Sequence, residues 1–175
     1  MARKETNINK VKMSYELTKN RKFFKKARAI VIKDNKILLI RVDYKDGHVH
    51  YLLPGGGVDA GETIKQAIIR ETLEEYNANV TPIKYLDKQY YNIELEYNNE
   101  KFVSNRVEYY YVCKFDNFAN RNKMGVGKEF ENPDKKYTKI ELSYEELLLL
   151  NHNSINSMNE RTYNKLLQYL KMANK

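Results

Sequence analysis

The stretch from Gly56 to Ala78 reads GGVDAGETIKQAIIRETLEEYNA, and the rest of the chain is organised around it. A glycine-rich turn over residues 53–57 leads into it. There Pro54 and the glycines stop any strand and let the backbone approach a ligand closely. From Glu62 to the residue before Asn77 the pattern is periodic and free of Gly and Pro, which predicts a helix. Because Asn tolerates the left-handed conformation, we expect Asn77 to end this helix.

The predicted helix carries acidic side chains where a purely structural helix would not place them. At about 100° per residue, Glu71 and Glu75 fall on one face and Glu74 lies at its edge. Like charges one turn apart cost roughly a few tenths of a kcal/mol, and acidic groups in the last turn oppose the helix dipole. Arg70 can neutralise one of these charges but not all of them. A divalent cation best supplies the missing charge, and carboxylates without His or Cys suit a hard ion such as Mg²⁺ or Mn²⁺.

A group of glutamates on a helix is more commonly a solvated face, so the spacing has to decide between the two interpretations. The stretch resembles the signature box of the Nudix hydrolases in the spacing of its glycine, arginine and acidic positions. Those positions are occupied by Gly56, Glu62, Arg70, Glu71, Glu74 and Glu75. Thr72 stands where an aliphatic residue is more usual, and Asn77 replaces the final glycine, but every acidic position matches.

This resemblance implies a fold, an activity and a set of roles. The fold would be α+β, a Nudix-like α/β/α sandwich with a mixed central sheet. The activity would be hydrolysis of a nucleoside diphosphate linked to another group, with Mg²⁺ or Mn²⁺ as cofactor. The metal-binding positions of the family fall on Gly56, Glu71, Glu74 and Glu75, and the catalytic positions on Glu62, Arg70, Glu71 and Glu75. In the family, the arginine is steadied by the first glutamate and holds the others by ion pairing.

The general base and the substrate contacts stay open at this level. Glu71 is the candidate base inside the box, while Glu129 and Glu131 are candidates at the end of a long loop. Loops of such length are usually functional or disordered. Arg41 could bind a phosphate, although an exposed salt bridge fits equally well. Tyr51 could stack on a base or simply pack in the sheet.

Length and charge limit the remaining possibilities. A chain of 175 residues is one domain of ordinary size, and we expect an N-terminal extension over residues 1–24 before a Nudix domain over residues 25–175. The net charge of +8 favours an anionic partner. The basic residues are spread along the chain, apart from the pairs Arg21-Lys22 and Lys25-Lys26. We therefore expect a small nucleotide as the partner rather than nucleic acid.

Other features bear on the compartment and the function class. Cys113 is the only cysteine, so no intramolecular disulfide is possible, and it lies in a strand-like stretch as a buried small side chain. No run approaches the ~18 apolar residues of a membrane span. We expect a cytoplasmic protein without a membrane partner, which could form a homodimer. The candidate substrates are a nucleotide sugar, an ADP-ribose-like compound or a nucleoside triphosphate.

Two other functions compete with this one. A non-catalytic nucleotide-binding Nudix module would be expected to lose box glutamates, and this chain keeps them. An RNA 5′-end Nudix hydrolase would need a basic channel next to the box.

The rest of the chain predicts the order of the other elements. We expect strands, one central helix, more strands and then C-terminal helices, which is an α+β pattern. Before the box we expect a loosely helical segment over 1–20, a hairpin over 27–42 turning at Asp34-Asn35 and a strand over 50–53. After it we expect β segments from Val80, over 85–97 and over 101–115, with a turn at Asn98-Asn99, then a loop over 116–136 and a strand over 137–142. The chain would end with a helix opened by Ser143 and ending at 150, and a helix opened by Ser157 and ending near Met172.

Overall fold

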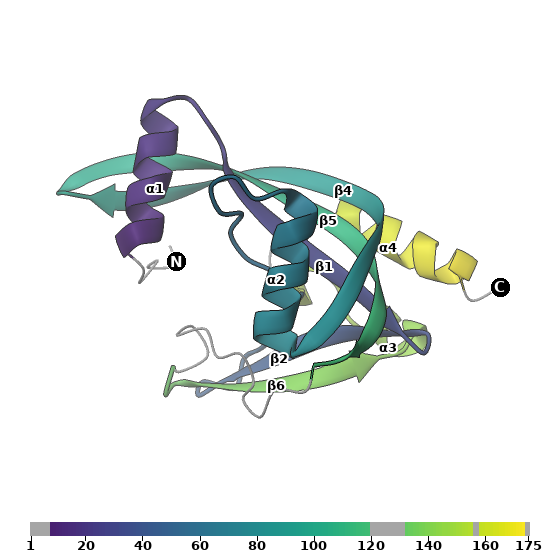
Figure 1. The fold of residues 1–175 in the computed structure, drawn as a ribbon. Helices are drawn as coiled ribbons and strands as arrows, with labels where there is room; N and C mark the ends of the chain where they lie inside the picture. The colour runs from purple at the N-terminus through teal and green to yellow at the C-terminus, as the bar shows by residue number, and fades with distance from the viewer. Residues whose placement is uncertain (1–7, 120–131, 156–157, 174–175) are drawn as a thin grey trace.

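A computed structural model describes residues 8–119, 132–155 and 158–173 of the chain (Figure 1). The elements follow one another as α1 (Ile8–Lys19), β1 (Phe24–Lys33), β2 (Lys36–Tyr44), β3 (Val49–Leu52), α2 (Ile64–Tyr76), β4 (Ala78–Tyr97), β5 (Glu100–Phe118), β6 (Lys135–Leu142), α3 (Tyr144–Leu148), the short η2 (His152–Ser154) and α4 (Glu160–Ala173).

The strands form one six-stranded sheet in the order β3-β2-β1-β5-β4, with β6 paired to β2. β1 and β5 run parallel, while the other pairs are antiparallel, so the sheet is mixed. β1 and β3 share one edge of β2, and β6 occupies the other edge. The α+β class with a mixed central sheet is therefore confirmed.

Helices cover both faces of this sheet (Figure 1). On one face, α2 packs through Ala67 and Ile68 against a fully buried layer that includes Leu38 and Cys113. On the other face, α3 and α4 pack against a second cluster of apolar side chains, with Leu166 fully buried. Burying a side chain of this size stabilises the fold by about 1.5–3 kcal/mol. The burial of Cys113 confirms the role predicted for it.

Two asparagine-containing turns close the β1–β2 and β4–β5 hairpins. Asp34 and Asn35 have φ of 48° and 60°, and Asn98 and Asn99 have φ of 52° and 62°. Positive φ at both central residues is the type I′ geometry, whose twist matches that of the flanking strands. Both turns were predicted from the sequence and both are confirmed.

The ends of α2 follow from its capping residues. The Thr63 side chain accepts a hydrogen bond from the Gln66 N–H, and the Gln66 side chain accepts one from the Thr63 N–H, which is a capping box. At the other end Asn77 has φ 58° and ψ 35°, and its N–H donates to the Leu73 carbonyl at 3.2 Å. The predicted left-handed helix end at Asn77 is confirmed.

The C-terminal helices differ in detail from the prediction. Ser143 and Glu146 form the predicted capping box, but α3 ends at Leu148 rather than at residue 150. Ser157 lies outside the described residues. The Asn159 side chain accepts a hydrogen bond from the Thr162 N–H at 2.9 Å, as an N-cap residue does, and so supports the start of α4.

The strands after α2 are longer than predicted. β4 is continuous from Ala78, because the chain passes Pro82 through a bulge between Pro82 and Lys84 instead of breaking there. A bulge accommodates a residue that has no N–H to donate. β5 extends to Phe118 and β6 begins at Lys135, so both ends of the loop predicted over 116–136 belong to strands. Residues 120–131 lie outside the description.

α1 packs against the far end of the β4–β5 hairpin (Figure 1). Val11 is buried there, and the ring of Tyr15 lies 5.3 Å from those of Tyr97 and Phe102. The Lys19 ammonium pairs with Glu100 on the same hairpin at 2.8 Å. The loosely helical segment expected over residues 1–20 is thus a helix packed on this hairpin in the part of it that the structure describes.

Among the described residues, no helix combines the length and the apolar character needed to cross a lipid bilayer.

Candidate active site

The glycine turn before α2 is hydrogen-bonded to β1 in the manner of an extra strand. The Ala29 N–H donates to the Pro54 carbonyl at 2.8 Å, and the Ala27 N–H donates to the Gly56 carbonyl at 2.9 Å. Gly55 has φ +143°, and a Cβ there would lie 2.1 Å from the Ala27 carbonyl oxygen. Only glycine fits this position, so the turn reaches α2 with a fixed geometry.

Arg70 is the centre of the ion-pair network on α2. Its Nε and Nη2 donate to the two carboxylate oxygens of Glu62, each at 2.9 Å. Its Nη1 donates to Glu71 at 2.8 Å and to Glu74 at 3.4 Å, and Nη2 also donates to the Gly57 carbonyl at 2.9 Å. The hydrogen bonds with Glu62 raise the pKa of Arg70 and lower the pKa of Glu62. Both groups are therefore charged at neutral pH.

Glu71 is buried against the glycine turn, with 8% of its surface exposed. A Cβ on Gly56 would lie 2.5 Å from one carboxylate oxygen of Glu71 and 2.7 Å from the other. The glycine therefore leaves the space that the carboxylate occupies. Burial raises the pKa of Glu71, and the hydrogen bond from Arg70 offsets part of that rise. A carboxylate in this environment accepts a proton more readily than an exposed one.

Glu75 is tied to the turn by a chain of hydrogen bonds that begins deep in the sheet. The Gly55 N–H donates to Glu75 at 2.8 Å, and the Gly55 carbonyl accepts from Arg28 Nη1 at 2.7 Å. The Nε of Arg28 donates to Glu108 at 2.9 Å, and Tyr110 donates to the other oxygen of Glu108 at 3.0 Å. Burial disfavours the charge on Arg28, but the charge of Glu108 outweighs this effect and raises the pKa of the guanidinium.

The residues of the box suit a hard cation by their chemistry. Glu71, Glu74 and Glu75 offer carboxylate oxygens, and the Glu71 carboxylate occupies the space above Gly56 that a side chain there would fill. Among the residues that the structure describes, no three His, Cys, Asp or Glu side chains are grouped closely enough to hold a metal ion. Arg70 instead occupies one oxygen of Glu71. A bound cation would therefore share Glu71 with Arg70 or displace Arg70 from this carboxylate.

The other predicted site residues lie apart from this network. Arg41 and Tyr51 face each other across β2 and β3, and strand alternation places Arg41 on the sheet face opposite α2. Arg41 pairs with Asp43 at 2.7 Å, and Tyr51 packs against the cluster under α4. Glu129 and Glu131 lie outside the described residues.

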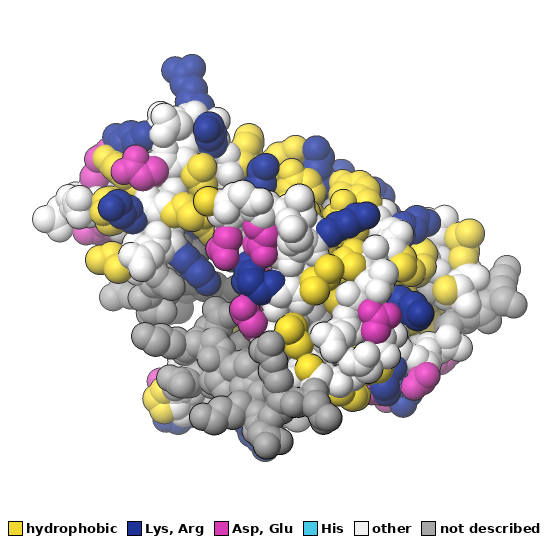
Figure 2. All heavy atoms as spheres, in the orientation of Figure 1, with side chains coloured by type: hydrophobic (Ala, Val, Ile, Leu, Met, Phe, Trp, Pro, Cys, Tyr) yellow, Lys and Arg dark blue, Asp and Glu magenta, His cyan; other side chains and the backbone are white. Residues whose placement is uncertain are grey.

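Figure 2 shows the surface over α2, where acidic side chains gather around a basic one near the middle of the face. The Glu74 side chain is half-exposed, with 50% of its surface accessible, and the Arg70 side chain is partly exposed, with 30% accessible. Glu71 beneath them is nearly enclosed. The network thus has an accessible side, formed by Arg70 and Glu74, and a buried side, formed by Glu71.

Sequence reasoning missed the Arg28–Glu108 pair. The signal was present, because Arg28 interrupts an apolar run in β1 and Glu108 precedes the tyrosines of β5. Charged residues inside such runs are buried only when they are paired. Nothing in the sequence indicated that Arg21, Lys22 and Lys25, which precede the box by more than 30 residues, line one pocket together with Glu62.

The model of the NUDIX domain matches residues 23–157 of the chain. The chain therefore belongs to the NUDIX domain family.

Two curated proteins match shorter stretches. The ADP-ribose pyrophosphatase of Methanocaldococcus jannaschii is 48% identical over 46 residues, which cover 26% of this chain and 27% of that protein. The NAD-capped RNA hydrolase NudC of Photorhabdus laumondii is 35% identical over 57 residues, covering 33% of this chain and 22% of that protein. The matched stretch thus spans about a quarter of the length of each of these relatives.

Solved structures share the fold over most of the chain. A NUDIX hydrolase from Nitrosomonas europaea has a TM-score of 0.55 and 17% identity, with 88% of this chain and 91% of that one covered. A structure described as UDP-X diphosphatase has a TM-score of 0.53 and 15% identity, with 93% and 72% covered. At this level of identity the likeness concerns the fold alone.

Proposed function

We propose that this chain hydrolyses a diphosphate bond in a nucleoside diphosphate derivative, with the help of a divalent metal ion. The observation that carries the proposal is the packing of the Glu71 carboxylate into the space above Gly56, with Arg70 holding it from the other side. A stable helix end gains nothing from a buried carboxylate with two more acidic side chains beside it, whereas a cation that binds phosphate oxygens is stabilised by such groups. Membership of the NUDIX domain family supports the same conclusion.

The residues of the box have separate roles in this proposal. Glu71, Glu74 and Glu75, with the Gly56 carbonyl, would hold Mg²⁺ or Mn²⁺. When bound, such an ion neutralises phosphate oxygens and lowers the pKa of a coordinated water. Arg70 positions Glu71 and Glu74, and Glu62 fixes Arg70 through its two hydrogen bonds.

Glu71 is also the candidate within the box for accepting the proton of the attacking water, because burial raises its pKa. Glu129 and Glu131 remain the candidates outside the box.

A nucleotide with a diphosphate in its interior is the substrate class that we favour. The two curated relatives are named for ADP-ribose and for an NAD cap, and both of these compounds contain an internal diphosphate joined to nucleosides or ribose. A non-catalytic binding module has less support, because this chain retains every acidic position of the box. A cytoplasmic location and a homodimer remain predictions from the sequence.

The proposal can be tested by screening nucleoside diphosphate sugars, ADP-ribose, NAD and nucleoside triphosphates with Mg²⁺. Release of phosphate or nucleotide is the measurement. The variant Glu75→Gln should fold and lose about a hundredfold or more in turnover, because it removes a charge that would hold the ion. Glu94→Gln, an exposed glutamate on β4, is the matched control and should keep its turnover. Turnover in Glu75→Gln equal to that of the wild type would contradict the proposal.

A further inference from the structure

A groove lies beside the box on the same side of the sheet as α2. Its floor is a row across three strands, in which Lys25 of β1 pairs with Val107 of β5 and Val107 pairs with Tyr90 of β4. One wall is α1, and the other is the segment between the glycine turn and α2. The lining residues are Met13, Leu17, Arg21, Lys22, Phe23, Lys25, Val58, Asp59, Ala60, Gly61, Glu62, Tyr90, Val107 and Tyr109. The groove therefore exists only because α1 packs beside the Nudix core.

Three cationic side chains line this groove without a protein partner. Arg21, Lys22 and Lys25 are exposed, and none of them forms an ion pair or a hydrogen bond through its side chain with any other residue that the structure describes. Unpaired cations along one groove attract an anion. The acidic residue Glu62 of the groove differs from these three cations, because its carboxylate already accepts hydrogen bonds from Arg70. The groove thus presents positive charge that the fold itself does not use.

A fixed turn holds these cations in place. The Lys22 N–H donates to the Leu17 carbonyl at 2.7 Å, and the Arg21 N–H donates to the Thr18 carbonyl at 3.0 Å. This pair of bonds is the Schellman ending of α1. Arg21 occupies its left-handed position with φ 55°, a place that Gly or Asn fills more easily. Strained residues of this kind are common at ligand sites, and here the strained residue is one of the groove cations.

Two aromatic rings stand exposed at the same groove. Phe23 is 44% exposed and Tyr90 is 57% exposed, and their ring centroids lie 5.4 Å apart in an edge-to-face arrangement. The exposed Lys88 ammonium lies 5.4 Å from the centre of the Tyr90 ring. Large apolar rings are normally buried, and an exposed pair next to cations is a platform on which a base can stack, in place of such a lysine on Tyr90. The apolar side chains of Met13 and Leu17 lie beside it. The groove therefore offers both a stacking surface and positive charge.

The size and the position of the groove agree with one nucleotide. Its volume is about 610 Å³, within the range of small-molecule sites. Glu62 belongs both to the groove and to the Arg70 network, so a ligand in the groove is adjacent to the box. Among the described residues that line the groove, three cations lack a partner, and Asp59 lies at the same wall. This limited charge suits a small nucleotide better than a long single strand, whose binding depends on many phosphate contacts.

From these observations we infer that the groove between α1 and the box binds the nucleoside part of the substrate. The base stacks on Phe23 and Tyr90, and Arg21, Lys22 and Lys25 contact the phosphate next to it. The inference rests on the proposed function, because it places the nucleoside end of the same substrate. It gives the N-terminal helix a role in substrate binding.

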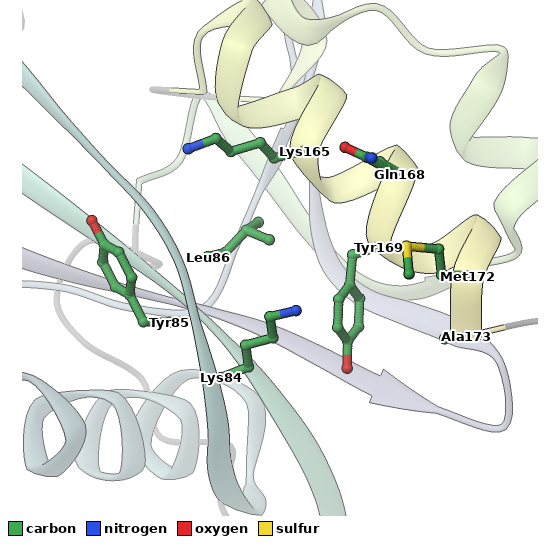
Figure 3. A pocket seen from close by; sticks show the side chains of 8 residues that line it. All are labelled: Lys84, Tyr85, Leu86, Lys165, Gln168, Tyr169, Met172 and Ala173. Atoms are coloured by element: carbon green, nitrogen blue, oxygen red, sulfur yellow. The ribbon is translucent and has the colours of Figure 1, made fainter.

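A second pocket serves as the comparison. It lies between β4 and α4, and Figure 3 shows that Lys84 and Tyr85 come from the strand while Lys165 and Tyr169 come from the helix. Its lysines already have partners, since Lys84 lies 5.0 Å from the centre of the Tyr169 ring and Lys165 pairs with Asp87 at 2.9 Å. Tyr85 is 45% exposed and packs edge-to-face on another ring, much as Tyr90 does. The second pocket therefore provides matched control variants.

Calorimetric titration of the full chain with AMP and with ribose 5-phosphate tests the inference without any need for turnover. The wild type should bind AMP about tenfold more tightly than ribose 5-phosphate, because only AMP carries a base to stack. This preference should disappear in Tyr90→Leu and in Phe23→Leu, and should persist in Tyr85→Leu. Lys22→Gln and Lys25→Gln should each weaken binding of both compounds severalfold, whereas Lys84→Gln should leave it unchanged.

Equal affinity of the wild type for AMP and ribose 5-phosphate, or an AMP preference that survives Tyr90→Leu in a folded protein, would overturn the inference. So would a single-stranded RNA that displaces AMP at physiological salt and binds more tightly than any free nucleotide. Hydrolysis of a nucleoside diphosphate with an unchanged KM in Tyr90→Leu would overturn the groove assignment and leave the proposed function standing. Absence of any hydrolysis, together with the AMP preference, would overturn the proposed function and leave nucleotide binding in the groove standing.

Discussion

Two charged clusters hold the glycine turn, one on each side of it. They differ in solvent exposure and in how far apart along the chain the paired residues lie. Arg70 pairs with Glu62, which is eight residues away, and 30% of its side chain is exposed. Arg28 pairs with Glu108, which is 80 residues away, and these two side chains are 12% and 0% exposed. One cluster reaches the surface over α2, and the other lies inside the sheet.

This difference in exposure separates what each cluster contributes. The Arg70 network can exchange partners with a ligand or a cation through Arg70 and Glu74, because solvent already reaches these two side chains. The Arg28–Glu108 pair cannot, because an unpaired charge at that depth would be costly. We therefore expect the exposed cluster to affect turnover and the buried cluster to affect stability.

The largest effect is expected for Glu108→Gln. The substitution leaves the Arg28 charge buried without its counter-charge, and breaking such a pair costs about 3–5 kcal/mol. Denaturant unfolding measures the loss directly. A loss below about 1 kcal/mol would mean that the pair is solvated in solution and that the proposed division between the two clusters is wrong.

Glu62→Gln should have the opposite profile. Arg70 keeps Glu71, Glu74 and the Gly57 carbonyl as partners and is partly exposed, so the free energy of unfolding should fall by less than about 1 kcal/mol. Turnover should fall by about tenfold or more, because residues that orient metal ligands have effects of that order. The two measurements are made on the same preparation. A stability loss as large as that of Glu108→Gln, with turnover unchanged, would contradict the assignment.

A third charged group extends the comparison to α4, with the smallest expected effect. Burial alone would raise the pKa of Asp87, but hydrogen bonds from Lys165 and Thr162 outweigh it and hold the pKa below its ordinary value. Because the folded pKa lies below the unfolded one, this carboxylate stabilises the fold fully above the unfolded value of about 3.9. That contribution is lost as the pH falls through the lower, folded value.

The pH dependence of unfolding tests this expectation. Between about pH 4 and the lower folded pKa, the wild type should lose stability more steeply than Asp87→Asn. Asp134→Asn, whose carboxylate is 67% exposed, is the control and should keep the wild-type slope. Identical slopes in the wild type and Asp87→Asn would show that Asp87 is not held in its charged form by its neighbours.

The sequence predicted the parts of this molecule that depend on neighbouring residues. The turns at Asp34-Asn35 and Asn98-Asn99 and the end of α2 at Asn77 each follow from the conformational preference of one or two residues. The spacing of the box likewise lets Arg70 on α2 meet both its neighbour Glu71 and Glu62, which lies just before the helix begins.

The parts that depend on distant pairing could not be predicted in this way. Arg28 meets Glu108 because β1 and β5 are parallel neighbours, and their register is set by the whole sheet. The cations of the groove come next to the box for a similar reason, since α1 packs on a hairpin formed much later in the chain. Continuity of β4 through Pro82 was also missed, because a bulge absorbs a residue that would otherwise end a strand.

The most direct test of the central claim is whether Mg²⁺ binds the folded protein through the box carboxylates. A ligand at ten times its Kd stabilises the native state by about 1.4 kcal/mol, which for a chain of this size raises Tm by roughly 3–6 °C. We predict a rise of this order in the wild type and in Glu94→Gln, and a much smaller rise in Glu71→Gln and Glu75→Gln. An equal rise in all four proteins would contradict the account, because the ion would then be bound elsewhere.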